Sequence, residues 1–141
     1  MSGNYVEKMY DEIKIGDEAE ISKVVTEEDI QKFSEVSLDT NPLHLDEEFA
    51  GKTIFKKRIA HGIIGASLIS AVLGTKLPGV NTIYMSQTLN FLAPVYIGDE
   101  ITARVKVVKK RDDKHMIFFE TVVVNQDGKK VITGEALVKK D

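Results

Sequence analysis

Apolar β-branched and aromatic residues, interspersed with polar ones, gather in five segments of the chain, a pattern typical of strands. These segments are residues 18–25, 82–92, 100–111, 116–125 and 130–139. Short polar connections separate the last three segments, and the second connection contains Asp127-Gly128, a pair that accepts the positive φ of a hairpin turn. The last three strands are therefore predicted to form an antiparallel meander.

A helix is predicted to begin after Thr26. The threonine hydroxyl can accept a hydrogen bond from a free backbone amide, and the three acids that follow suit the positive end of a helix dipole. Apolar residues then recur at helical spacing until the helix ends near Ser37. An Asn-Pro pair predicts a loop at residues 38–44, because proline disfavours helical conformation in the residue before it. Residues 46–50 are expected to add one more helical turn.

Residues 62–77 are predicted to form a helix at the centre of the fold. Their apolar side chains spread around the helix axis, so other parts of the chain have to cover this helix on nearly every side. The segment is shorter than the ~20 apolar residues that a membrane span needs. Together the elements indicate the α+β class: a curved antiparallel sheet of about five strands around a central apolar helix, in a single domain of residues 1–141. A sheet this small leaves edge strands to pair, so we expect a dimer.

Composition narrows the class of function. The chain has 141 residues, 43% of them hydrophobic, which is enough for one domain with its own core. A net charge of -3 provides no overall positive field, so neither nucleic acid nor an anionic membrane is an expected partner. Cysteine is absent, which excludes thiolate metal sites and a cysteine nucleophile, and the cytoplasm is the expected location. The three histidines are scattered in the sequence and predict no metal site.

The stretch that contains Asp39, Asn41 and His44 is the first candidate for chemistry. A loop bent by proline can bring the carboxylate of Asp39 and the imidazole of His44 toward one point, where they can orient water and exchange protons near neutral pH. The alternative is an Asx turn, in which Asp39 and Asn41 cap local backbone amides and His44 lies on the surface. Residue types and spacing alone leave both interpretations open.

The second candidate is the start of the central helix, at His61 and Gly62. The first turn of a helix has unpaired amide donors, which can bind an oxyanion that develops on a carbonyl. Gly62 either lets a substrate approach the backbone or, like Gly65, lets the helix pack tightly against the sheet. His61 is either a second acid–base group or a buried structural histidine bonded to backbone, and the structural role is favoured.

The run from Phe33 to Asp46, followed by Ala60-His61-Gly62, resembles the MaoC-like hydratases, and in particular the short (R)-specific enoyl-CoA hydratases. The similarity covers nearly the whole chain after Ile15. It implies the hotdog fold, a long helix wrapped by a curved antiparallel sheet, and assembly as a homodimer or a dimer of dimers. The implied reaction is the reversible addition of water to a trans-2-enoyl-CoA, which gives the (R)-3-hydroxyacyl-CoA. It implies no metal or redox cofactor, because coenzyme A is part of the substrate.

The resemblance also implies roles for single residues. Asp39 and His44 would hold the water, and the amide of Gly62 would polarise the thioester carbonyl. Asn41 within the motif and Ser70 on the central helix would contribute to substrate binding.

Two positions near the motif raise further expectations. Leu38 stands where the family usually has glycine, which affects the geometry of the turn more than the chemistry. The basic run at residues 56–58, Lys56-Lys57-Arg58, lies near the site and could meet the phosphates of coenzyme A, although such a run is more often a solvated surface.

Three alternatives have to be compared with the hydratase. A hotdog thioesterase commonly uses an acidic residue on the central helix, and residues 62–77 contain none. Dehydratases that act on acyl-carrier-protein substrates have a different histidine motif and an acid on that helix. A non-catalytic protein that binds acyl-CoA would need neither Asp39 nor His44.

Overall fold

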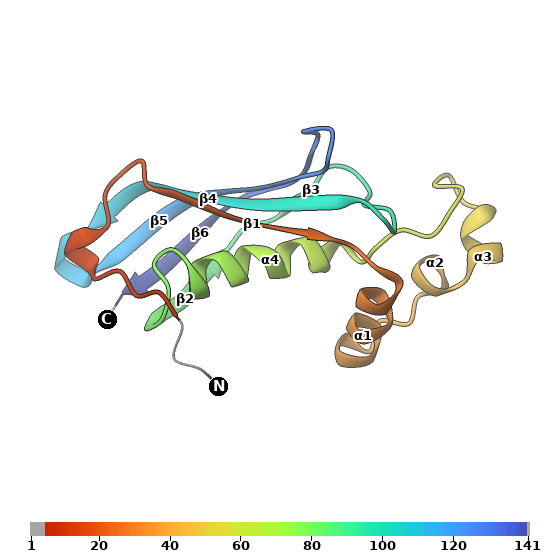
Figure 1. Cartoon of the computed structure of the whole chain (residues 1–141), viewed down its shortest axis with the longest axis horizontal. Helices are drawn as coiled ribbons and strands as arrows, with labels where there is room; N and C mark the ends of the chain where they lie inside the picture. The colour runs from red at the N-terminus through yellow and green to blue at the C-terminus, as the bar shows by residue number, and fades with distance from the viewer. Residues whose placement is uncertain (1–4, 141) are drawn as a thin grey trace.

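The computed structural model describes residues 5–140 of the chain. Its elements, in chain order, are η1 (Tyr10–Glu12), β1 (Glu18–Val24), α1 (Glu27–Ser37), α2 (Pro42–Leu45), α3 (Glu47–Gly51), α4 (Gly62–Thr75), β2 (Thr82–Gln87), β3 (Asn90–Phe91), β4 (Glu100–Arg111), η2 (Asp112–Lys114), β5 (Met116–Val124) and β6 (Lys130–Lys140). Figure 1 shows the strands as one curved layer over α4, with α1, α2 and α3 beyond one end of that helix.

The strands form a single antiparallel sheet in the order β1-β4-β5-β6-β2. The predicted meander of the last three strands is confirmed, and the predicted Asp-Gly turn has Gly128 at a φ of 75°. The segment at residues 82–92 is not one strand. It divides into β2 and the two-residue β3, both of which pair with β6.

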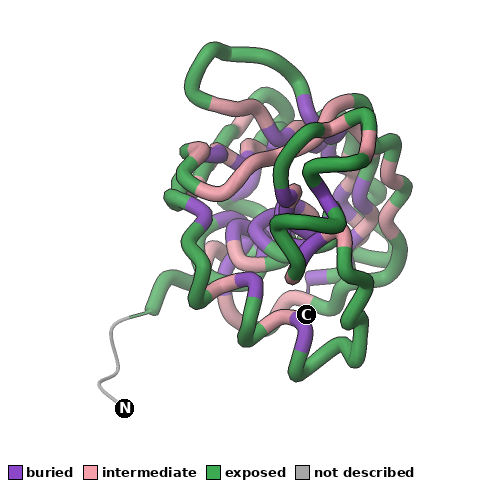
Figure 2. The backbone as a smooth tube through the Cα atoms, turned by 90° about the vertical axis from the view of Figure 1, so that its right-hand side faces the viewer, coloured by how far each residue is buried: buried purple, intermediate pink, exposed green. Residues whose placement is uncertain are grey.

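The core lies between this sheet and one side of α4. Figure 2 shows the buried residues gathered toward the middle of the molecule. The buried residues of α4 recur three and four apart, as a single face requires; they are Ile64, Gly65, Leu68, Ile69, Val72 and Leu73. At Gly65 the sheet comes so close that an added Cβ would lie 2.9 Å from the Cδ1 atom of Ile132. The expectation that α4 is covered on nearly every side is wrong for this chain. Ile63, Ser67 and Ser70 are exposed on the side that the sheet does not cover.

The end of the molecule that contains α1, α2 and α3 is built by side-chain caps. Thr26 caps α1 in a capping box with Asp29, as the sequence predicted in part. Asp46 caps α3 through the amides of Glu48 and Phe49. The predicted loop ends earlier than expected, because the proline takes the first position of the short helix α2 and Asn41 caps it. Among the described residues, no helix has the length and apolarity to span a bilayer.

Candidate active site

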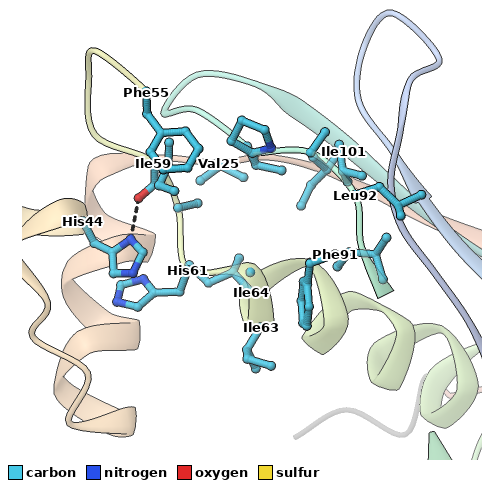
Figure 3. A pocket seen from close by; sticks show the side chains of 18 residues that line it. Val25, His44, Phe55, Ile59, His61, Ile63, Ile64, Phe91, Leu92 and Ile101 are labelled. Carbon is cyan, nitrogen blue, oxygen red and sulfur yellow. Dashed lines mark hydrogen bonds between the residues drawn. The ribbon is translucent and has the colours of Figure 1, made fainter. Parts of the chain in front are cut away.

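A cavity of about 510 Å³ opens between the N-terminus of α4 and the sheet. Apolar side chains such as Val25, Phe55 and Ile101 line most of it. His44 and His61 are the two titratable side chains in the lining, and they lie together on one side of the cavity (Figure 3). An apolar pocket with a few polar groups at one place is the usual form of a small-molecule site.

His44 is fixed within the wall of the cavity. It lies on α2, is 8% exposed, and its Nδ1 atom is 2.8 Å from the carbonyl oxygen of Ile59 (Figure 3). A carbonyl oxygen only accepts hydrogen bonds, so Nδ1 carries the hydrogen. The other ring nitrogen, Nε2, makes no hydrogen bond within the described residues. The ring is therefore held in one tautomer, with Nε2 available for proton exchange.

His61 is buried behind His44, and the two rings stack with their centroids 3.9 Å apart. Its Nε2 donates to the backbone carbonyl of Asp39 at 3.1 Å and lies 3.2 Å from the hydroxyl of Ser34. Its Nδ1 is buried without a partner among the described residues. Burial lowers the pKa of His61, and the neighbouring His44 acts in the same direction. His61 thus stays neutral near pH 7 and bonds to backbone, as expected of a structural histidine.

Asp39 and Asn41 both take part in local turns. The Oδ1 atom of Asp39 accepts from the amide of Asn41 at 3.2 Å, and the Oδ1 atom of Asn41 accepts from the amide of Leu43 at 3.0 Å. The capping alternative is therefore correct for these two side chains, but His44 does not lie on the surface. Asn41 is exposed, and its oxygen is used to cap α2.

The turns nevertheless bring the candidate acid–base groups together. One carboxylate oxygen of Asp39 and one nitrogen each of His44 and His61 lie within 4.8 Å of one another. Two of the three histidines are therefore not scattered in space. The donor set suits a metal poorly, because stacked rings with planes 30° apart do not direct their in-plane lone pairs at one ion. The exposed carboxylate of Asp39 and the two buried rings thus form one compact cluster of acid–base groups.

Gly62 begins α4, and its amide makes no hydrogen bond within the described residues. The preceding residue, His61, gives no side-chain cap, so this end of the helix has free donors beside the cavity. The ring of Phe91 stands against Gly62, and a Cβ added at Gly62 would lie 2.8 Å from the ring. The lack of a side chain at Gly62 therefore allows Phe91 to pack closely. The backbone amide of Gly62 stays free at the same time.

Other predicted site residues lie elsewhere. Ser70 is exposed on α4, eight positions after Gly62, and is not part of the cavity lining. The expected phosphate contact does not hold for Arg58, which is buried and bonded to Glu27 and to the backbone of His44. Lys56 is exposed, and the Nζ atom of Lys57 lies 4.7 Å from the centre of the Tyr96 ring.

The segment that contains Ile59 and Ala60 is joined by backbone hydrogen bonds to another part of the cavity wall, around Val95. The amide of Ala60 donates to the carbonyl of Val95 at 2.7 Å, and Ile59 forms a β-bridge with Tyr96. Ile59, Ala60 and Val95 all line the cavity. The backbone that orients His44 and the backbone that forms part of the apolar wall are therefore one hydrogen-bonded unit.

The MaoC-like domain model matches residues 11–129, which include Asp39, His44, His61 and Gly62. The chain belongs to the MaoC-like domain family. An (R)-specific enoyl-CoA hydratase of Rhodospirillum rubrum is 48% identical to this MaoC-like chain over 129 residues, 92% of the chain and 89% of the relative. The (R)-specific enoyl-CoA hydratase of Aeromonas caviae is 43% identical over 127 residues, 90% of the chain and 95% of the relative.

A solved structure described as the (R)-hydratase from A. caviae involved in PHA biosynthesis superimposes with a TM-score of 0.89 at 43% identity. The alignment covers 92% of the MaoC-like chain and 98% of that structure. The family resemblance, the α+β class and the hotdog fold that the sequence predicted are thereby confirmed.

Sequence reasoning missed the residues that hold this site from behind. Arg58 was interpreted as part of a basic surface run, and Ser34 was not considered. The sequence did contain a signal for the ion pair of Arg58, because Glu27, at the start of the predicted helix, has the opposite charge. The backbone carbonyl of Ile59 leaves no trace in a sequence, because every residue has one.

Proposed function

We propose that this protein is an (R)-specific enoyl-CoA hydratase, which adds water reversibly to a trans-2-enoyl-CoA and gives the (R)-3-hydroxyacyl-CoA. The observation that carries the proposal is the proximity of Asp39 and His44 beside an apolar cavity that also meets the free first amide of α4. The activities printed for the two bacterial relatives support it, since both match nearly the whole chain.

The residues divide the reaction between them. Asp39 and His44 hold one water molecule and take one of its protons as its oxygen attacks C3 of the enoyl thioester. Negative charge then moves to the thioester oxygen, where the amide of Gly62 donates a hydrogen bond to the enolate-like species. A proton from the acid–base pair is delivered to C2 on the face that the water attacked, because one pair of groups handles both transfers. Nε2 is the atom of His44 that exchanges protons, because Nδ1–H is bonded to Ile59. No metal or redox cofactor takes part.

Asn41 and Ser70 have weaker support as substrate-binding residues. Asn41 acts on the site through the cap of α2, so its contribution is to the position of His44. Ser70 can take part in substrate binding only if the substrate or a second subunit lies along the exposed side of α4.

We also propose that the enzyme acts as a homodimer or as a dimer of dimers. Ile63, Phe91 and Leu92 are 49%, 52% and 56% exposed, and all three line the cavity. A second subunit over these side chains would close the cavity and remove apolar surface from water. Light scattering of the purified protein tests this, and a monomeric active enzyme would overturn it. The cytoplasmic location stays a prediction.

The activity is tested with crotonyl-CoA, by following the loss of the conjugated enoyl absorbance. An (R)-specific dehydrogenase should then oxidise the product and an (S)-specific one should not. A thiol reagent in a parallel assay detects free coenzyme A. Release of thiol without hydration would identify the thioesterase alternative, and binding of acyl-CoA without either reaction would identify the non-catalytic one.

A further inference from the structure

Arg58 is a buried charge at the base of the candidate active site. It is 9% exposed and lies outside the lining of the cavity. A guanidinium with so little access to water is stable only where its donors are paired. Its partners therefore indicate what it does.

The partners of Arg58 lie on two different helices. Its Nη1 and Nη2 atoms donate to the two carboxylate oxygens of Glu27 on α1, each at 2.8 Å. Its Nε atom donates to the backbone carbonyl of His44 on α2 at 2.7 Å. The fork of the guanidinium thus joins the start of one helix to the backbone of the histidine that exchanges protons.

Glu27 is held in the ionised form that this fork requires. The hydrogen bonds from Arg58 lower the pKa of Glu27, and a further bond from Gln31 acts in the same direction. Glu27 also lies in the first turn of α1, where the helix dipole favours a negative charge.

His44 is consequently held by two hydrogen bonds, which come from the consecutive residues Arg58 and Ile59. Arg58 binds its backbone carbonyl, while the carbonyl of Ile59 accepts from its ring. The first contact fixes where the residue sits, and the second fixes how the ring is turned. Helix α2 has four residues and no stability of its own, so its position depends on contacts of this kind.

We propose that Arg58, anchored by Glu27, is a positioning residue that holds the backbone of His44 where its ring reaches the carbonyl of Ile59, and thereby keeps the tautomer required for proton exchange. The inference rests on the proposed hydratase function for its kinetic consequence. Arg58 does not contact the substrate, so its loss lowers kcat and leaves KM nearly unchanged. The consequence for the tautomer of His44 exists whatever reaction the protein catalyses.

The decisive variant is Arg58→Lys, which keeps the charge but cannot bond both to Glu27 and to the carbonyl of His44 through one fork. Arg104→Lys is the matched control. Arg104 pairs with Glu20 at 3.0 Å on the sheet, and that pair is exposed. We expect Arg58→Lys to lower kcat about 10-fold or more, since a small misplacement of a catalytic group has effects of this order. KM and the activity of Arg104→Lys should stay within about twofold.

A second measurement separates positioning from general damage. The ¹⁵N shifts of the histidine rings report which nitrogen carries the hydrogen, and the His44→Ala variant identifies the signals of His44. The parent protein should show His44 protonated at Nδ1, and Arg58→Lys should show a mixture of tautomers. Glu27→Gln should shift the signals in the same direction, since it removes the anchor of Arg58.

Each possible result either supports or overturns the proposal. Arg58→Lys with kcat within twofold of the parent, or with the Nδ1–H signature of His44 unchanged, overturns the proposal. If Arg58→Lys does not fold, Glu27→Gln decides by the same two criteria. An inactive parent protein would refute the hydratase function, but it would leave the tautomer measurement valid, so the two failures are distinguishable.

Discussion

The meander and the region around α1 and α2 are stabilised by different interactions. In the meander, buried residues alternate with more exposed ones along most of β4 and β5, and the buried ones, such as Val105 and Phe119, are 0% exposed. Around α1 and α2, by contrast, the buried residues include His44, Arg58 and His61. Apolar packing dominates in the meander, where Thr121 and Lys140 are the buried polar exceptions, whereas the region around α1 and α2 buries a cluster of polar groups held by specific hydrogen bonds.

Two backbone features near the site depart from local rules, although a positive φ at a non-glycine residue also occurs in the meander, at His115 (52°). Leu38, which ends α1, has a φ of 65°, in the left-handed region that costs most residues energy. The first amide of α4 has no cap. Departures from local rules collect at functional sites, because a reacting group has to be left unpaired and its neighbours must compensate. The following predictions test whether activity and stability are separated in this way.

The largest effect is expected from the acid–base pair. His44→Ala or Asp39→Asn should lower kcat by at least ~10²-fold, the usual scale for a general acid–base group. Asparagine can still accept from the amide of Asn41, so Asp39→Asn should keep the turn and the stability of the parent. Steady-state kinetics with crotonyl-CoA and urea unfolding check both statements. Full activity in either variant would remove the catalytic assignment.

The meander should show the reverse behaviour. Phe119→Ala should reduce the free energy of unfolding by ~3–5 kcal/mol, because it leaves a cavity in a packed core. Phe118→Ala is the control: Phe118 lies on the opposite face of the same strand and is partly exposed, so the loss should be well under half as large. At a temperature where Phe119→Ala is folded, kcat should match the parent. A selective loss of kcat would contradict the separation.

Two substitutions of Gly62 test its amide, because both add a Cβ and only proline removes the donor. Proline is tolerated at the first position of a helix, and His61 already has the extended conformation that precedes proline, with ψ of 130°. Gly62→Pro should lower kcat ~10²–10³-fold relative to Gly62→Ala, because an oxyanion donor is lost. Both variants place a Cβ against Phe91, so the comparison isolates the amide. Equal rates in the two variants would exclude this amide from the reaction.

The smallest effect concerns the strained turn. Leu38→Gly should raise the free energy of unfolding by ~1 kcal/mol relative to Leu38→Ala, since glycine adopts a positive φ without steric cost. Leu38 is 83% exposed, so neither variant loses buried apolar area. Urea denaturation of the two variants measures the difference. An alanine variant as stable as the glycine one would show that the turn is not strained.

The regular part of the fold was predictable from the sequence. Hydrophobic periodicity and caps fixed β1, α1 and the meander to within a residue or two. The side of α4 left open by the sheet was not predicted, because an apolar segment does not show how much of its surface one chain can cover. Likewise α2 was missed, since it has four residues and depends on its proline and the Asn41 cap.

The candidate site was predictable in part. The Asp-x-Asn-Pro-Leu-His motif named Asp39 and His44, and the structure brings them together. Their support was not predictable: His61 binds the carbonyl of Asp39, and Arg58 binds that of His44. Contacts from side chains to distant backbone carry no periodic signal in a sequence. Such contacts become visible only when the chain is folded.

The bridge between Ile59 and Tyr96 has a consequence for any attempt to redesign the enzyme. Residues 91–95 line the cavity, and through this bridge and the bond from Ala60 to Val95 they are joined to the segment whose Ile59 carbonyl accepts from the ring of His44. Widening the pocket for a bulkier tail would shift that segment as well. Under the proposed function, substitutions at residues 91–95 that change chain-length preference are expected to change turnover as well, and a second substitution would be needed to recover it.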